Sequence, residues 1–135
     1  MIIDGTDLIL GRLATYVAKQ ALLGEKIDVV NAEKVIVTGN KVTTFNKYKD
    51  RVKMGDNVKG PFIPRLPDRL LRRAIRGMLP YKQEKGRLAF KRVMCYVGLP
   101  EKFKDQKLET IKNAHITKMK NLKYTTIEKI SKQIK

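Results

Sequence analysis

The chain has 135 residues, of which 42% are hydrophobic, and its formal net charge is +17. These values exclude a disordered basic tail, and the single cysteine excludes an intramolecular disulfide and a cysteine-cluster zinc site. No apolar run reaches the roughly 18 residues of a membrane span, and no secretion signal is recognisable, so a cytoplasmic protein is expected. The excess of cations predicts a polyanionic partner, either nucleic acid or, as the alternative, an anionic membrane surface.

The N-terminal part has the pattern of a strand, a helix and a second strand. We expect strands at 1–4 and 27–30, and between them a helix from about residue 10 to residue 23, ended by Gly24. A strand–helix–strand pattern within residues 1–30 implies that the two strands are parallel and joined by a right-handed crossover. Arg12 and Lys19 lie off the apolar face of the helix, where they can reach a ligand. The apolar face itself comprises Leu13, Ala14, Val17, Ala18 and Ala21.

A third apolar strand and a strongly basic helix follow. The strand is expected at 34–37 and the helix at 41–53, with Val42, Phe45 and Tyr48 on the apolar side together with Val52. The helix also carries candidate ligands for a polyanion, namely Lys41, Lys47, Lys49, Arg51 and Lys53.

The stretch 54–67 is the least regular part of the chain, with two glycines and three prolines. It also carries the basic residues Lys59 and Arg65 and the apolar pair Phe62 and Ile63, which needs something to pack against. Because a long loop without secondary structure in a compact domain is usually functional, we interpret this segment as a basic binding loop.

The most strongly patterned helix is expected after this loop, with Asp68 as its N-cap and Pro80 as its stop. At about 100° per residue, the apolar residues fall on one broad face and the arginines on the opposite face. The apolar face comprises Leu70, Leu71, Ala74, Ile75, Met78 and Leu79, and the arginine face comprises Arg69, Arg72, Arg73 and Arg76.

The positive charge extends beyond this helix. Between residues 65 and 92 there are ten Lys or Arg residues against only Asp68 and Glu84. A charge run is usually a solvated face, but solvated helix faces normally mix signs and gain Glu–Lys pairs one turn apart. Like charges in one stripe repel one another, so the pattern favours a polyanion, and arginine forks match phosphate geometry.

The C-terminal part is less clearly patterned. A short basic segment at 84–92 leads into an apolar strand at 93–97, where Cys95 is expected as a small buried side chain. Residues 102–123 are expected to be mostly irregular. A C-terminal helix is predicted at about 125–135, because Thr125 and Glu128 have capping-box spacing before an isoleucine stripe.

Motifs for catalysis or for metal binding are weak. The segment from Gly5 to Arg12 lacks the spacing and the Lys-Ser/Thr pair of a phosphate-binding loop, and His115 is the only histidine. An RNA-processing enzyme with a carboxylate or metal site near Asp4 and Asp7 is kept as the alternative function. A DNA-compacting protein is a third hypothesis. We expect no catalytic residue, no metal site and no cofactor.

Several motifs together resemble the universal large-subunit ribosomal protein L13 family, in its shorter archaeal form. They occur in the family's order from about Ile3 to Phe103. Matching segments include Leu10-Gly11-Arg12-Leu13-Ala14, Val30-Asn31-Ala32-Glu33-Lys34-Val35, Val37-Thr38-Gly39-Asn40-Lys41 and Ala74-Ile75-Arg76-Gly77-Met78-Leu79-Pro80. The resemblance implies an α/β fold, with one three-layer α/β/α domain over residues 1–135 around a small, mostly parallel four-stranded sheet.

The resemblance also implies a structural constituent of the large ribosomal subunit that binds large-subunit (23S) rRNA and supports subunit assembly. Its expected partners are this rRNA and neighbouring large-subunit proteins, with no membrane and no small-molecule substrate. Folded RNA is recognised largely through shape and backbone contacts, which suits an arginine stripe. The candidate RNA-binding residues are Arg12, Lys41, Lys47, Lys49, Arg51, Lys53, Lys59, Arg65, Arg69, Arg72, Arg73, Arg76, Lys82, Lys85, Arg87, Lys91 and Arg92.

Overall fold

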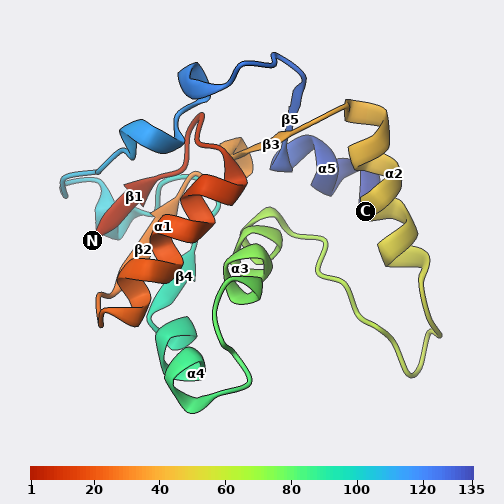
Figure 1. The fold of residues 1–135 in the computed structure, drawn as a ribbon, viewed down its shortest axis with the longest axis horizontal. Coiled ribbons are helices and arrows are strands. Elements are labelled where there is room, and N and C mark those ends of the chain that lie inside the picture. The colour runs from red at the N-terminus through yellow and green to blue at the C-terminus, as the bar shows by residue number, and fades with distance from the viewer.

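Three short parallel strands form the central sheet of the computed structural model, which describes all 135 residues. They are β1 (Ile2–Asp4), β2 (Ile27–Val30) and β4 (Val93–Cys95), and β2 lies in the middle. The helix α1 (Leu10–Leu22) connects β1 to β2, and these strands pair in parallel register. The predicted parallel crossover in the N-terminal part is therefore confirmed (Figure 1).

The prediction of a four-stranded sheet is wrong. The third strand, β3 (Ile36–Thr38), pairs instead with β5 (Tyr124–Thr126) in a separate antiparallel sheet. Only five residues separate β2 from β3, whereas a parallel neighbour needs a crossover of about a dozen or more. The connection turns sharply at Asn31, whose φ is 54°, and a short 3-10 helix follows.

One face of the parallel sheet is covered by α1 together with α3 (Pro67–Gly77) and α4 (Glu84–Lys91). The strand side chains that point to this face, such as Ile3 and Val29, are fully buried. The predicted apolar face of α1 is buried in full, comprising Leu13, Ala14, Val17, Ala18 and Ala21. This layer contains most of the hydrophobic core.

The opposite face of the sheet has no second layer of α-helices, so the predicted α/β/α arrangement is wrong in its third layer. Ile2 and Val30 point to this face and pack against Phe103, with Tyr96 beside them. The rings of Tyr96 and Phe103 meet edge to face, with their centroids 5.5 Å apart. Residues 102–123, expected to be mostly irregular, form only short 3-10 helices between loops.

The basic helix α2 (Lys41–Lys53) has the predicted bounds. Its N-cap is Asn40, whose side-chain oxygen accepts a hydrogen bond from the backbone N–H of Val42 at 3.0 Å. Phe45 and Tyr48 are half-buried against the core, as expected, but Val42 is 65% exposed. Val42 lies in the first turn of α2, and Figure 1 shows this helix at the edge of the molecule near α5.

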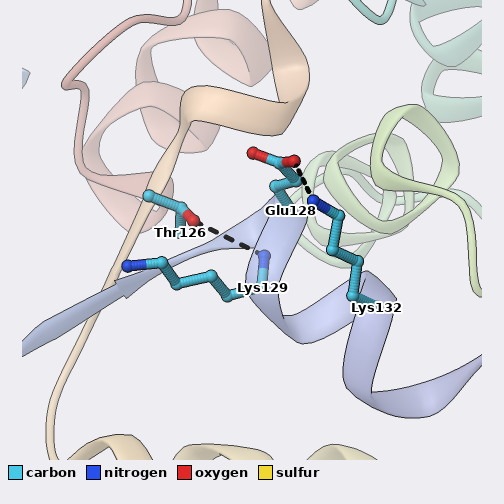
Figure 2. A network of polar contacts seen from close by, with 4 residues as sticks. All are labelled: Thr126, Glu128, Lys129 and Lys132. Carbon is cyan, nitrogen blue, oxygen red and sulfur yellow. Dashed lines mark hydrogen bonds and ion pairs between the residues drawn. The ribbon is translucent and has the colours of Figure 1, made fainter.

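The C-terminal helix α5 (Ile127–Ile134) is confirmed, but its predicted capping box is wrong. The N-cap is Thr126, whose hydroxyl accepts from the Lys129 N–H at 3.5 Å. Glu128 instead accepts a 2.6 Å hydrogen bond from Lys132 one turn later (Figure 2). That hydrogen bond and the Lys132 charge lower the pKa of Glu128. The predicted isoleucine stripe of α5 is buried.

Candidate nucleic-acid interface

Helix α3 separates an apolar face from an arginine face, as predicted, except that Met78 at its C-terminal end is 44% exposed. Leu71 and Ile75 are fully buried, whereas Arg69 and Arg73 are exposed. The start of the helix differs from the prediction, because Leu66 is the N-cap and Asp68 lies inside the first turn. Pro67 occupies the first helical position, which suits a residue without an N–H donor, and the cap at Leu66 therefore lies two residues before the predicted position. The helix also ends at Gly77, before Pro80.

Two of the four arginines on α3 are held by the protein itself. The Arg72 Nε donates a hydrogen bond to the carbonyl oxygen of Val93 in β4 at 3.1 Å. Its guanidinium carbon also lies 4.3 Å from the ring centroid of Phe90 in α4. Similarly, the Arg76 guanidinium lies 5.0 Å from the Tyr81 ring centroid. These contacts fix the orientation of both side chains before any ligand binds.

We therefore expect Arg72→Ala to destabilise the fold, because it removes the hydrogen bond to Val93 and the contact with Phe90. The expected loss is about 1–3 kcal/mol in the free energy of unfolding. Arg73→Ala removes the same charge from an exposed neighbour and should change stability by less than about 0.5 kcal/mol. Urea unfolding of both variants measures this difference, and equal midpoints would contradict the structural role of Arg72.

Helix α4 places further cations beside α3. Its residues Lys85, Arg87 and Lys91 are exposed, as is Lys82 just before the helix. A Cβ added at Gly86 would lie 2.1 Å from the carbonyl oxygen of Pro80, so only glycine permits this close approach of α4 to the preceding turn. The backbone thus fixes where the α4 cations lie relative to α3.

The loop 54–67 completes a groove over the arginine face. The loop residues Phe62 and Pro64 line this groove together with Arg69, Arg72, Arg73, Arg76 and Phe90. Figure 1 shows the loop as an extended arm between α2 and α3. Of the apolar pair that was predicted to need a packing partner, Phe62 is 71% exposed and Ile63 is half-buried. The loop carries Lys59 as a further exposed cation.

The five basic residues predicted on α2 are all exposed. Two of them lie over aromatic rings of the same helix: Lys41 over Phe45 at 5.8 Å, and Arg51 over Tyr48 at 6.0 Å, measured to the ring centroids. Burial raises the pKa of Tyr48, although the charge of Arg51 acts in the opposite direction. The cations of α2 therefore remain available to a partner.

Three of the predicted arginines also donate hydrogen bonds to backbone carbonyl oxygens of distant segments. Arg12 donates to the carbonyl oxygen of Asn113 at 3.1 Å, and Arg65 to that of Lys135 at 3.2 Å. Arg92 donates to the carbonyl oxygen of Ala21 at 3.3 Å, close to the C-terminus of α1. Sequence patterns do not reveal such contacts, because each partner is distant along the chain.

Carboxylates do not neutralise this basic surface. The molecule has two ion pairs, Lys104–Glu101 and Lys132–Glu128, and both join neighbours along the chain. None of the seventeen predicted RNA-binding residues takes part in an ion pair. With 30 Lys and Arg residues in the chain, most of the positive charge is uncompensated by the protein itself.

A second group of cations, none of them among the seventeen candidate RNA-binding residues, lies beside α1. Two hollows meet at Arg12. The lysines that line them are Lys19, Lys112, Lys118, Lys120 and Lys123. Four of these lysines belong to the irregular segment 102–123, and the high lysine content of that segment was the only signal in the sequence.

The carboxylate near the first strand has a structural role. The Asp4 Oδ1 accepts hydrogen bonds from the Thr6 N–H at 3.0 Å, the Thr6 hydroxyl at 2.8 Å and the Asn31 amide at 2.9 Å. Burial raises the pKa of Asp4, but the hydrogen bonds from Asn31 and Thr6 outweigh it and hold this pKa below its usual value. Asp4 therefore fixes the turn after β1. No group of three or more His, Cys, Asp or Glu residues is arranged to hold a metal ion.

Cys95 is buried in β4, as predicted. Burial raises the pKa of its thiol to about 12, although the charge of Arg72 acts in the opposite direction. The thiol is therefore protonated at neutral pH and serves as a packing group. None of the helices combines the length and the hydrophobicity needed to cross a membrane.

These features define a class of protein: a small, strongly basic α/β domain whose cations gather on exposed helices and loops. Comparison with known families gives the particular family. The profile of the family described as "Ribosomal protein L13" matches residues 1–102. The chain therefore belongs to the ribosomal protein L13 family, which consists of ribosomal proteins and not of enzymes.

Curated relatives match nearly the whole chain. A protein of Methanococcoides burtonii named "Large ribosomal subunit protein uL13" is 44% identical over 133 residues, covering 98% of this chain and 96% of the relative. Relatives with the same name from Archaeoglobus fulgidus and Haloarcula marismortui are 42% and 41% identical. These matches cover 98% and 99% of this chain, and 86% and 90% of the two relatives. The predicted archaeal resemblance is thus confirmed, and it extends into the C-terminal segment.

Proposed function

We propose that this chain is a structural constituent of the large ribosomal subunit. In this role it binds large-subunit rRNA through contacts of arginine and lysine with the phosphate backbone, and it supports subunit assembly. The family and the names of the relatives support membership of the large subunit. Neighbouring large-subunit proteins are the other expected partners.

The observation that carries the RNA-binding part of this proposal is the uncompensated charge of α2, the loop 54–67, α3 and α4. A folded domain that keeps so many cations without carboxylate partners gains stability from an external polyanion. Each contacted phosphate releases condensed counterions, and arginine forks bind phosphate oxygens in bidentate geometry. The surface therefore suits the backbone of a folded RNA.

Within this surface the residues have two kinds of role. Arg69, Arg73 and the exposed lysines of α2 and α4 are free to contact phosphates directly. Arg72 and Arg76 bind as guanidinium groups already oriented by neighbouring rings, which reduces the entropy lost on binding. The loop 54–67 with the exposed Phe62 then packs into the RNA or against a neighbouring protein.

Recovery of the chain from cell lysate tests this proposal. A tagged copy should sediment with large ribosomal particles, and the RNA retained on it should be enriched in large-subunit rRNA over small-subunit rRNA. The double variant Arg69→Ala/Arg73→Ala should retain less rRNA while keeping its fold. Recovery of DNA, or of RNA without preference for large-subunit rRNA, would contradict the proposal and favour a non-specific compacting role.

A further inference from the structure

The groove over the arginine face has features that phosphate binding alone does not require. Four arginines line it together with two phenylalanines and a proline, and no carboxylate is among the lining residues. Its volume is about 380 Å³, within the range of roughly 300–1,000 Å³ typical of pockets for small organic ligands. A purely electrostatic contact with an RNA backbone would need cations but no aromatic walls.

Phe62 is the most exposed of these aromatic walls. Its side chain is 71% exposed and belongs to neither hydrophobic cluster of the protein. The ring lies against the backbone of Gly60, where an added Cβ would come within 3.0 Å of the ring carbon Cδ2. Gly60 also has a φ of +82°, so a side chain at this position would be both strained and crowded. The Phe62 ring therefore lies beside the Gly60 backbone at the edge of the groove.

The other side of the groove presents a guanidinium plane in a fixed position. The Arg72 Nε is hydrogen-bonded to the Val93 carbonyl, and its guanidinium carbon lies 4.3 Å from the Phe90 ring centroid. Unpaired bases of RNA stack on aromatic rings and on arginine planes. An A-form duplex keeps its bases stacked inside the helix and offers mainly phosphates and 2′-hydroxyls to a protein.

We infer that this groove is a binding site for unpaired nucleotides of a folded RNA, in which one base stacks on Phe62 and the flanking phosphates bind Arg69 and Arg73. The inference rests on the proposed RNA-binding function and adds which form of RNA enters the groove. The remaining cations of α2 and α4 contact phosphates of paired or unpaired RNA alike.

The test compares two probes at the same salt concentration. One is a short single-stranded RNA carrying a fluorescent purine analogue, and the other is the same strand annealed to its complement. The full chain should bind the single strand more tightly and change the analogue's fluorescence through stacking. Phe62→Ala should weaken single-strand binding by about 5- to 150-fold, as expected for one lost base stack. The same variant should leave the affinity for the duplex and the salt dependence of RNA binding unchanged.

Three further variants separate stacking from charge and from loop structure. Val58→Ala removes another apolar side chain of the same loop. Val58 is 81% exposed and does not line the groove, so the affinity of this variant for the single strand should match that of the unmodified chain. Phe62→Trp should retain single-strand binding, because it keeps an aromatic face. Arg73→Ala should reduce the salt slope for the single strand by about 0.7.

Equal affinity for the two probes, with Phe62→Ala no weaker than Val58→Ala, would overturn the inference. Strong salt-dependent binding in that experiment would leave the proposed RNA-binding function standing. Absence of salt-dependent binding to either probe would overturn both.

Discussion

Replacement of Ile75 by aspartate is expected to unfold the domain. Ile75 lies on the apolar face of α3, is fully buried, and belongs to the main hydrophobic cluster. The variant places a carboxylate in this cluster of apolar residues, which contains no cation to pair with it. An unpaired buried charge costs several kcal/mol, about 4 or more. A domain of this size is stabilised by only about 5–15 kcal/mol in total.

Arg73→Ala is the matched control for this prediction. It lies on the same helix and lowers the net charge by the same single unit, but its side chain is exposed on the opposite face. Thermal unfolding followed by circular dichroism should show a midpoint for Ile75→Asp more than about 10 °C below that of Arg73→Ala, or no cooperative transition. Two similar midpoints would mean that the two faces of α3 have been assigned wrongly.

The sequence predicted best those elements whose register is set by local periodicity. The apolar face of α1 and the bounds of α2 follow directly from helical spacing. The residues at the helix ends, the N-cap Asn40 and the glycine Gly24 after α1, add to this signal. The parallel order of β1 and β2 follows from the helix that connects them. These features depend on neighbours along the chain, which are visible in the sequence.

Features that depend on distant segments were predicted poorly. The pairing of β3 with β5 joins residues about ninety positions apart, and β5 lies in a stretch without an apolar pattern. That pairing also explains the error at the start of α5, since Thr125 is a buried strand residue opposite Val37 and leaves the cap to Thr126. The face of the sheet opposite α1 is covered by a loop around Phe103, which no periodicity could indicate.

The candidate site shows the same division. Periodicity identified which side of α3 carries the arginines, but it did not distinguish the exposed Arg73 from Arg72, which is bonded to the Val93 carbonyl. That difference arises because β4 and α4 pack beside α3 and offer a carbonyl and a ring. The cations of the segment 102–123 were missed for a related reason: the fold brings them to Arg12, but no pattern in the sequence links them.

The salt dependence of binding to large-subunit rRNA tests the central claim most directly. If the surface neutralises about six phosphates, the affinity should fall about a thousandfold between about 50 and 200 mM salt. Each contact contributes about −0.7 to −0.9 to the slope of log K against log salt. Arg69→Ala/Arg73→Ala removes two exposed cations of the groove, so its slope should be shallower by about 1.4–1.8.

The matched control is Lys104→Ala/Lys107→Ala, which removes the same charge from exposed residues of the loop that covers the opposite face of the sheet. Its slope should equal that of the unmodified chain. The measurement is an equilibrium titration of the three proteins with large-subunit rRNA at several salt concentrations. A steep slope that only the arginine variant reduces is the predicted result. A nearly flat titration, or equal losses of slope in both variants, would contradict the claim that these arginines bind the RNA backbone.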